Sequence, residues 1–355
     1  MARNSIGKNI TITSFGESHG DSVGVVIDGF PSNFTIDLNA LQSFVDRRKP
    51  GQSDITTPRK EADTVKILSG FYNGKSLGSP IAIVIPNLDA KPADYEALKD
   101  VYRPGHADWL YQEKYQHRDH RGGGRSSARI TAGWVAAGAL AIQYLKQQGI
   151  QVTAWVNQVW TIQAPDAVNT PSPDSIERNK VRCWHQETAD EMIAAISQAK
   201  NDGDSLGGVI RCVVDGMPAG VGEPVFGKLQ AILGLYLLNI NAVKGIAFGD
   251  GFSSSTMKGS EHNDELTMVE GRIQGVSNHA GGIVGGMSTG DAIQMDVAFK
   301  PTSTIALTQQ TVDVNGNQVE LSATGRHDPC VLPRAVPIIE AMTALAIMDL
   351  LIETR

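Results

Sequence analysis

The spacing of apolar positions changes several times along the chain and predicts both strands and helices. Short runs that alternate or consist of β-branched residues are typical of strands, and longer runs with apolar positions three or four residues apart are typical of helices. We predict strands at 10–15, 23–27, 65–69, 81–85 and 207–214, with further strands among glycine turns in 245–251, 280–290 and 292–300.

The helical periodicity is clearest in 126–148, an Ala-rich apolar segment that follows a glycine run, with Ser126 and Ser127 as candidate caps. Asp37 is placed to cap a shorter amphipathic helix over 37–48, which Pro50 and Gly51 stop. Residues 102–125 read as a loop, and the Pro- and Asp-rich stretch 163–182 as a peripheral excursion. We predict the other helices at 189–201, 224–238 and 336–352.

These elements intermingle without the strict strand–helix alternation of a doubly wound nucleotide-binding fold. The sequence has no internal repeat of 20–50 residues and no low-complexity linker. We therefore expect one compact α+β domain over residues 1–355.

Composition narrows the class of protein. The 355 residues are 41% hydrophobic and 19% charged, as in ordinary globular enzymes, and the net charge of −7 disfavours nucleic-acid binding. The three cysteines are far apart, which argues against a disulfide framework or a zinc site. The N-terminal residues lack the apolar core of a signal peptide, and Glu340, Thr343 and Asp349 interrupt the most apolar segment, 338–352. We expect a cytoplasmic protein that does not enter membranes.

The segment Gly16-Glu17-Ser18-His19-Gly20 places reactive side chains between glycines. It matches G-x-S-x-G, the nucleophile elbow of serine hydrolases, but that elbow requires a helix directly after the serine. A strand is predicted there instead, which disfavours a hydrolase. The remaining alternatives are a polar hairpin turn and a functional site, and we favour the site.

Three further segments suggest an anionic ligand. Residues 47–60 hold five cations and one acid, Asp54, although cations at a helix end also suit the helix dipole. Residues 103–108 (RPGHAD) and 119–129 (DHRGGGRSSAR) lead into the long predicted helix. Free N–H groups at that helix start would hold an anion, and arginines would add bidentate contacts. No G-x-x-x-x-G-K-[ST] or G-x-G-x-x-G motif is present.

Histidines and hydroxyls complete the pattern. His117 and His120 have no third ligand nearby in sequence, so a metal site is disfavoured. Residues 325–330 (GRHDPC) precede the last helix, and 300–304 (KPTST) end a strand with one cation and three hydroxyls. Arginines that bind a phosphate dianion and a histidine that protonates its oxygen suit chemistry in which phosphate leaves. These residues alone name no substrate and no cofactor.

Taken together and in order, these segments resemble the chorismate synthase family over nearly the whole chain. The motifs are GESHG, RRKPGQS, RPGHAD, HRGGGRSSARIT, the stretch 238–245, SNHAGGIVGG, AFKPTST and GRHDPCVLPRAVPIIEAM. The resemblance implies an anti-1,4-elimination that converts 5-O-(1-carboxyvinyl)-3-phosphoshikimate to chorismate and phosphate. It also implies a lyase that needs reduced FMN without net redox change, a β-α-β sandwich with helices between antiparallel sheets, and a homotetramer.

The resemblance also assigns roles to single residues. His19 would protonate the reduced flavin, His106 would be the general acid toward the leaving phosphate, and Asp328 would relay a proton, with Ser18 and Ser127 positioning groups nearby. The anions of the substrate would be bound by Arg48, Arg103, Arg129 and Arg334. The FMN contacts would be Arg125, Ser126, Ser127, Asn241, Ala242, Gly285, Lys300, Pro301, Thr302, Ser303, Thr304 and Arg326.

The sequence departs from the family pattern at Asp54, where relatives often carry a cation, and more mildly at Met287 and Thr304. Asp54 puts one anion contact in question. No added flavin-reductase domain is evident, so we expect an external reductant rather than self-reduction with NADPH. Two other hypotheses remain open: a non-catalytic anion-binding protein, and a serine hydrolase that uses Ser18.

Overall fold

The structure, a computed structural model, describes residues 3–57, 61–89, 95–96, 98–322 and 328–353. Its first half is built around a five-stranded antiparallel sheet of order β1-β2-β3-β7-β4. Alternate side chains of β7 are buried, as expected for a sheet covered on one face. The strands are β1 (Ser5–Ile6), β2 (Thr11–Phe15), β3 (Ser22–Asp28), β4 (Lys66–Ile67) and β7 (Ile81–Pro86).

A second five-stranded antiparallel sheet has the order β11-β16-β10-β8-β9. Its central strand β10 pairs with β8 on one side and β16 on the other. Buried side chains of both sheets and of the helices between them form one continuous apolar cluster. The strands are β8 (Gln151–Val159), β9 (Ile162–Gln163), β10 (Gly208–Asp215), β11 (Val243–Phe248) and β16 (Ile293–Phe299).

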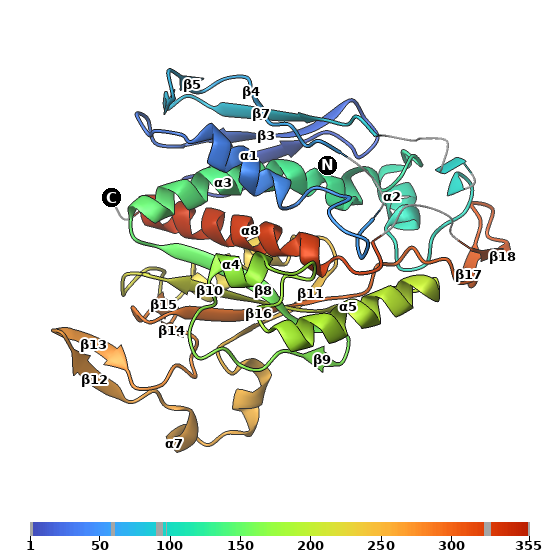
Figure 1. The fold of residues 1–355 in the computed structure, drawn as a ribbon. Helices are drawn as coiled ribbons and strands as arrows, with labels where there is room; N and C mark the ends of the chain where they lie inside the picture. The colour runs from blue at the N-terminus through green and yellow to red at the C-terminus, as the bar shows by residue number, and fades with distance from the viewer. Residues whose placement is uncertain (1–2, 58–60, 90–94, 97, 323–327, 354–355) are drawn as a thin grey trace.

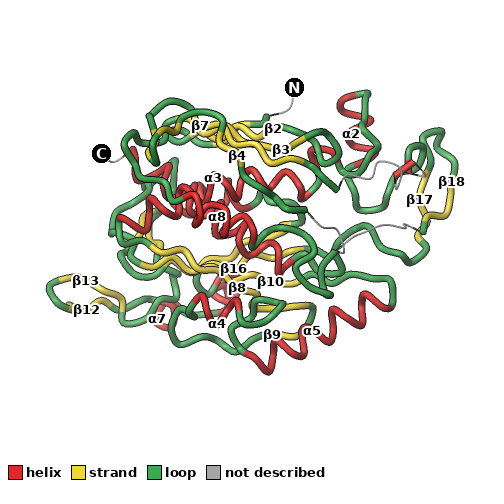
Figure 2. Tube along the Cα trace, turned by 45° about the horizontal axis from the view of Figure 1, so that its top comes forward, coloured by secondary structure: helices red, strands yellow, loops and turns green. Residues whose placement is uncertain are grey.

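Two long helices pack against each other between the sheets (Figures 1 and 2). A Cβ on Gly138 would lie 2.3 Å from Ala341 Cβ, so the close approach of these helices requires glycine at that position. One of the two shorter core helices packs on each of the long ones. The four are α1 (Leu38–Asp46), α3 (Thr131–Gln147), α6 (Leu229–Leu237) and α8 (Leu332–Glu353).

The remaining elements lie at the periphery. The hairpin β12–β13 projects from the body, and α4 and α5 lie along the second sheet (Figure 1). These elements are α2 (Asp108–Tyr115), α4 (Pro173–Glu177), α5 (Gln186–Asn201), α7 (Gly259–His262), the 3₁₀ turns η2 (Gly124–Ser126), η3 (Ala128–Ile130) and η4 (Gly251–Thr256), and the strands β5 (Phe71–Tyr72), β6 (Lys75–Ser76), β12 (Leu266–Val269), β13 (Arg272–Gly275), β14 (Ile283–Val284), β15 (Met287–Ser288), β17 (Gln309–Val312) and β18 (Gln318–Leu321).

The predicted α+β sandwich with helices between antiparallel sheets is confirmed. The cap of α1 is as expected, since the Asp37 side chain accepts hydrogen bonds from the N–H groups of Asn39 and Ala40. Several predictions are wrong in detail, and the helix predicted at 224–238, for example, begins at Leu229. The segment 102–125 is not all loop, because α2 lies inside it, and α3 begins at Thr131 rather than Ser126 because two 3₁₀ turns precede it.

The excursion at 163–182 covers the outer face of the second sheet. Ile176 of α4 packs with Trp155 and Val213, which project from β8 and β10. Both faces of β8 are therefore buried, and the strand lacks the alternating pattern by which a half-buried strand is recognised. This explains why no strand was predicted there.

One helix of the described chain, Leu332–Ile352, is long and apolar enough to cross a membrane, and most of it is buried inside the molecule. Its polar residues do not disqualify it by composition, contrary to our expectation. They have partners in the protein instead: Glu340 pairs with Arg47, and Asp349 accepts from the backbone N–H groups of Lys8, Asn9 and Ile10. The burial is that of a core helix.

Candidate active site

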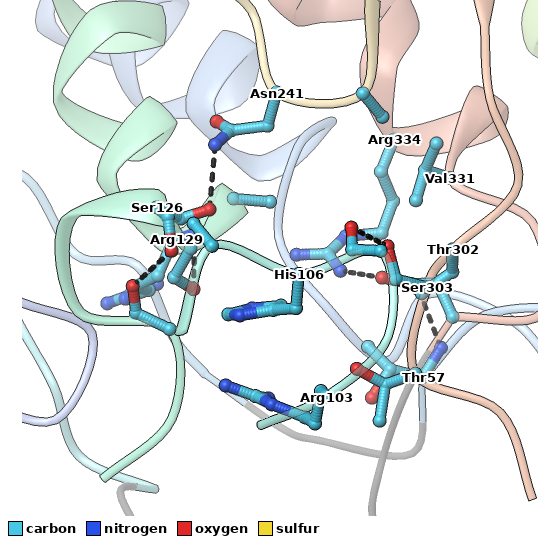
Figure 3. A pocket seen from close by; sticks show the side chains of 18 of the residues that line it. Thr57, Arg103, His106, Ser126, Arg129, Asn241, Thr302, Ser303, Val331 and Arg334 are labelled. Carbon is cyan, nitrogen blue, oxygen red and sulfur yellow. Dashed lines mark hydrogen bonds and ion pairs between the residues drawn. The ribbon is translucent and has the colours of Figure 1, made fainter. Parts of the chain in front are cut away.

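A cleft of about 330 Å³ collects most of the residues that the sequence analysis proposed for chemistry. Its lining comes mainly from six separate parts of the chain: the segment after α1, the two Arg- and Gly-rich segments around α2, the α6–β11 connection, residues 300–304 after β16, and the start of α8. Figure 3 shows these side chains converging on one space. The predicted residues that line it are Arg48, Arg103, His106, Ser126, Ser127, Arg129, Asn241, Ala242, Lys300, Pro301, Thr302, Ser303, Thr304, Asp328 and Arg334.

One side of the cleft is an arginine cluster, which we define as Arg48, Arg129 and Arg334 with their counter-ions Asp63 and Asp328. The fully buried carboxylate of Asp63 bridges Arg48, at 3.0 Å, and Arg129. Asp328 pairs with Arg334 and also accepts from the N–H of Thr57 at 2.9 Å. Three guanidiniums thus share two carboxylates, which leaves one positive charge in excess.

Backbone carbonyls and one side-chain amide hold two of these guanidiniums further. Arg48 donates to Ala128 O at 2.7 Å, and Arg129 donates to Pro86 O at 2.9 Å and to Asn87 Oδ1 at 2.7 Å. Burial and the neighbouring charge of Arg334 lower the pKa of Arg48, which Asp63 opposes. Burial alone would raise the pKa of Asp63, but the charges of Arg48 and Arg129 hold it below its usual range. The guanidiniums are thus held by several partners each, and a bound anion would offset the excess positive charge of the cluster.

A second group joins Arg103, His106 and Asp108 at the entrance to α2. Arg103 binds Asp108 through Nε and Nη2, both at 2.8 Å, and His106 Nδ1 lies 2.8 Å from Asp108 Oδ1. Figure 3 shows the His106 imidazole between Arg103 and the segment that carries Ser126 and Arg129. This arrangement presents a histidine to the same cleft that the arginine cluster lines.

The same cleft also has a loop side, which we define as Asn241, Ala242 and residues 300–304. Asn241 donates to Ser126 O at 2.8 Å, while its own Oδ1 and the hydroxyl of Thr302 are buried and have no hydrogen-bond partner in the part of the chain that the structure describes. Among the described residues, no carboxylate pairs with Lys300, and burial together with Lys244 lowers its pKa. Unpartnered buried polar atoms are rare in proteins. Their presence here suits a polar ligand that would form hydrogen bonds with these atoms.

Ser18 and His19 do not line the cleft but lie directly behind it. A Cβ on Gly122, which has φ of +82°, would meet the His19 ring at 2.5 Å, so glycine is needed at this contact. The His19 ring stands edge-on to Tyr95, which lines the cleft, with ring centres 4.8 Å apart. Ser18 is 1% exposed and is followed by β3, not by a helix. A hydrolase elbow is therefore ruled out by geometry as well as by pattern.

The anion cradle at the helix start differs from the prediction. The N–H groups of Ser126 and Ser127 already donate to Gly123 O and Gly124 O, and the N–H of Arg129 donates to the Ser127 side chain. Ser127 is thus a cap, as expected, but of η3. Ser126 is not, because its hydroxyl donates to Gly123 O. The positive charge in the cleft therefore comes from side chains, and these N–H groups are not free to bind an anion.

Other predicted residues lie elsewhere. Arg125 lines an adjoining hollow of about 670 Å³ and ties this segment to the GESHG turn through Gly16 O at 2.8 Å. Gly285 lies in the β14–β15 turn and does not line the cleft, so its FMN contact stays a prediction. Arg326 is outside the described residues. Asp54 pairs with Lys180 on the surface, also away from the cleft, so its departure from the family pattern does not alter the lining.

Sequence reasoning missed the carboxylates that hold the cations. It counted Asp54 as the one acid near Arg48, whereas the partner is Asp63. It quoted Asp108 within RPGHAD and gave it no role. The excess of arginines itself was the available signal, because buried guanidiniums require counter-ions.

Comparisons of the sequence and of the structure with known proteins find similar proteins along nearly the whole chain. A sequence model of the chorismate synthase family matches residues 10–352. The chain is 53% identical to the chorismate synthase of Opitutus terrae over 347 residues, which covers 98% of this chain and 96% of that protein. It is 52% identical to that of Phocaeicola vulgatus over 346 residues, covering 98% and 97%. A crystal structure of chorismate synthase superposes with a TM-score of 0.79 at 27% identity and covers 98% of this chain and 93% of that one.

Proposed function

Because the chain belongs to the chorismate synthase family, we propose that it converts 5-O-(1-carboxyvinyl)-3-phosphoshikimate to chorismate and inorganic phosphate in the shikimate pathway. The reaction is a carbon–oxygen lyase step, an anti-1,4-elimination. The C–O bond to phosphate breaks, a ring proton is lost, and a second ring double bond forms. One observation carries the proposal: His106 and the arginine cluster line the same cleft.

Each part of the cleft has a task in this reaction. Arg48, Arg103, Arg129 and Arg334 bind the phosphate and the two carboxylates of the substrate, because guanidinium forks match such groups. His106 donates a proton to the departing phosphate oxygen, a step worth roughly 10²–10⁴-fold in rate. Asp328, held between Arg334 and the N–H of Thr57, is the proposed acceptor in the path of the ring proton. Ser127 keeps Arg129 in place through its cap.

The cleft also fits reduced FMN, the cofactor that the family implies. The buried, unpartnered Asn241 Oδ1 and Thr302 hydroxyl, together with Lys300, offer acceptor, donor and positive charge to a flavin and its phosphate. Ser126, Ser127, Asn241 and residues 300–304 would hold the flavin, and His19 behind Gly122 would hold a proton near it. When bound, reduced FMN supplies electron density that helps phosphate to leave. We expect it to be reduced by an external donor rather than by this chain with NADPH.

The assembly and location are part of the same proposal. The β12–β13 hairpin exposes Leu266, Met268 and Ile273, and it projects from the body (Figure 1). Exposed apolar clusters of this kind favour burial against another subunit, which supports a homotetramer. We place the enzyme in the cytoplasm. Sedimentation velocity decides the assembly: a species near four times 38.0 kDa is expected, and a monomer at micromolar concentration would contradict it.

An anaerobic assay with reduced FMN and the phosphorylated substrate tests the proposed function. Chorismate and phosphate should form in equal amounts, and His106→Ala should lower turnover by roughly 10²–10⁴-fold. Tight substrate binding without product would make the protein a non-catalytic anion binder. The same assay in air with only NADPH and oxidised FMN should give no turnover, and product there would overturn the external reductant.

A further inference from the structure

Arg182 ends the excursion 163–182 and is a buried arginine without a place in the proposed reaction. It is 6% exposed and lies outside the cleft lining. Its backbone has a φ of +61°, a left-handed conformation that residues other than glycine rarely adopt. The backbone is held there, because Arg182 O accepts from Val156 N of β8 at 2.9 Å. A buried charge on a strained backbone is costly, which favours a specific task for the side chain.

The guanidinium of Arg182 reaches both chain segments that precede an arginine of the cluster. Its Nη1 donates to Arg47 O at 2.9 Å and also to Pro333 O. The first carbonyl belongs to the peptide bond that leads into Arg48, and the second to the one that leads into Arg334. Arg334 in turn donates through Nε to Arg48 O at 3.2 Å. One guanidinium therefore ties together the peptide units from which two cluster arginines project.

Gln52 extends this contact over the segment after α1. Its Oε1 accepts from Nη2 of Arg182 at 3.1 Å, and its Nε2 donates to Arg47 O and Lys49 O, both at 2.6 Å. The segment 47–52 is thus closed on itself by an amide that Arg182 holds. Gln52 is exposed, so its side chain can be shortened without uncovering a buried charge.

Two glutamates balance the charge around Arg182, and we define Arg47, Arg182, Glu177 and Glu340 as the outer network. Glu177, the last residue of α4, accepts from Arg182 Nε at 2.9 Å and from Arg47 Nε at 2.7 Å. Arg47 also pairs with Glu340 of α8. Burial lowers the pKa of Arg182, and the carboxylate of Glu177 opposes that shift. Because its charges cancel, the outer network acts on the cleft through position rather than through charge.

We propose that Arg182 is a positioning residue that sets the spacing and direction of Arg48 and Arg334, and thereby the affinity of the cleft for the anions of the substrate. This role rests on the proposed function only for the identity of those anions. A guanidinium fork binds phosphate or carboxylate through N–H groups at a fixed separation, so a displacement of about 1 Å is enough to lose a contact. Lysine at position 182 lacks the planar fork that reaches several acceptors at once.

The first experiment reads substrate affinity without turnover. The phosphorylated substrate is titrated calorimetrically into enzyme that carries oxidised FMN. In Arg182→Lys its Kd should rise roughly 10- to 100-fold, as for displaced hydrogen bonds to charged groups. FMN affinity, from flavin fluorescence, should stay within about a factor of two, because the loop side is built from other segments. A wild-type substrate Kd in folded Arg182→Lys would overturn the proposal.

Gln52→Ala decides the matter if Arg182→Lys fails to fold. It breaks the link between Arg182 and the segment 47–52 and leaves no buried charge unpaired. Substrate Kd should rise about three- to tenfold, the worth of one neutral hydrogen bond. Wild-type affinity in Gln52→Ala beside an unfolded Arg182→Lys would make Arg182 a purely structural residue and overturn the positioning role.

Arg211→Lys is the matched control. Arg211 also joins the excursion to the second sheet, with Asp166 at 2.7 Å and Asp296 at 2.9 Å, and it lies outside the cleft lining. This variant should keep the wild-type substrate Kd whatever its unfolding free energy. An equal rise in Kd in Arg211→Lys and Arg182→Lys would show a general loosening of the outer layer and would overturn the specific role.

Steady-state kinetics in the anaerobic assay separate this proposal from the proposed function. In Arg182→Lys, KM should rise with Kd and kcat should fall by a smaller factor, because Arg182 touches no reacting atom. A lower kcat with unchanged Kd and KM would contradict action through the arginines. A wild-type enzyme that binds the substrate without turnover would overturn the proposed reaction, and the comparison of Kd values would still decide the role of Arg182.

Discussion

The arginine cluster and the loop side face the same cleft, and they prepare for a ligand in different ways. In the arginine cluster, buried carboxylates and carbonyls already satisfy the guanidiniums. On the loop side, Lys300 has no carboxylate partner among the described residues, and Thr302 and Asn241 keep buried atoms unpartnered. The first side is preorganised and contributes to folding. The second carries an energetic cost that a ligand can remove.

The largest expected effect comes from breaking the arginine cluster at Asp63. Asp63→Asn leaves two buried guanidiniums without their counter-ion and should lower the free energy of unfolding by about 3–5 kcal/mol. Asparagine tolerates the positive φ of +49° at this position, so backbone strain adds little. Urea unfolding measures the loss. The exposed pair of Asp54 with Lys180 is the control, and Asp54→Asn should leave the midpoint unchanged. An equally unchanged midpoint in Asp63→Asn would contradict the account.

The same stabilisation should vanish in acid. Because the pKa of Asp63 is lower in the folded state, its contribution is complete above the unfolded value near about 4 and is lost as pH falls toward the folded pKa. The difference in unfolding free energy between wild type and Asp63→Asn should be constant from pH 6 to 8 and shrink below about pH 4. Urea titrations at each pH measure it. A difference in unfolding free energy that grows as the pH falls would contradict a lowered pKa of Asp63 in the folded state.

On the loop side, removing a charged group should not lower the free energy of unfolding. Lys300→Met removes a cation without a carboxylate partner, so the free energy of unfolding should stay level or rise. FMN affinity should fall roughly 10- to 100-fold, as for a lost hydrogen bond to a charged group. Flavin fluorescence titration and urea unfolding of one preparation measure both. Loss of stability with unchanged affinity would show that Lys300 is structural.

The smallest expected effect is that of Thr302→Val, which keeps the shape and removes an unpartnered hydroxyl. Unfolding free energy should not fall, and FMN affinity should drop about three- to tenfold, the worth of one neutral hydrogen bond. Ser303→Ala is an informative companion, because the Ser303 hydroxyl already donates to Gly105 O at 2.7 Å. Its loss should therefore cost stability. Equal changes in unfolding free energy in the two variants would contradict the contrast between the unpartnered hydroxyl of Thr302 and the bonded hydroxyl of Ser303.

The sequence predicted much of this arrangement and missed what holds it in place. The capped helix after Asp37 and most cleft residues were named from local pattern and motif. The strand β8 was not predicted from the sequence, because both of its faces are buried. The helix α2 was not predicted either, because its only buried residue is Asp108 and it has no apolar stripe.

The counter-ions of the arginines were not predicted, for a different reason. Asp63 lies 15 residues from Arg48 and 66 from Arg129, and nothing local shows that one carboxylate meets both. Asp108, by contrast, stands two residues from His106, and the spacing alone could have suggested a pair. Contacts between distant segments depend on how α3 packs on the first sheet, which no single segment encodes.

Hydrogen exchange of the whole enzyme, alone and then with FMN and the phosphorylated substrate, tests the central contrast most directly. The account predicts that amides of residues 302–304 become more protected when ligands bind. It predicts that amides around Arg48 and Arg129 are already protected in the free enzyme and change little. Protection gained mainly around Arg48 and Arg129, with residues 302–304 unaffected, would contradict it.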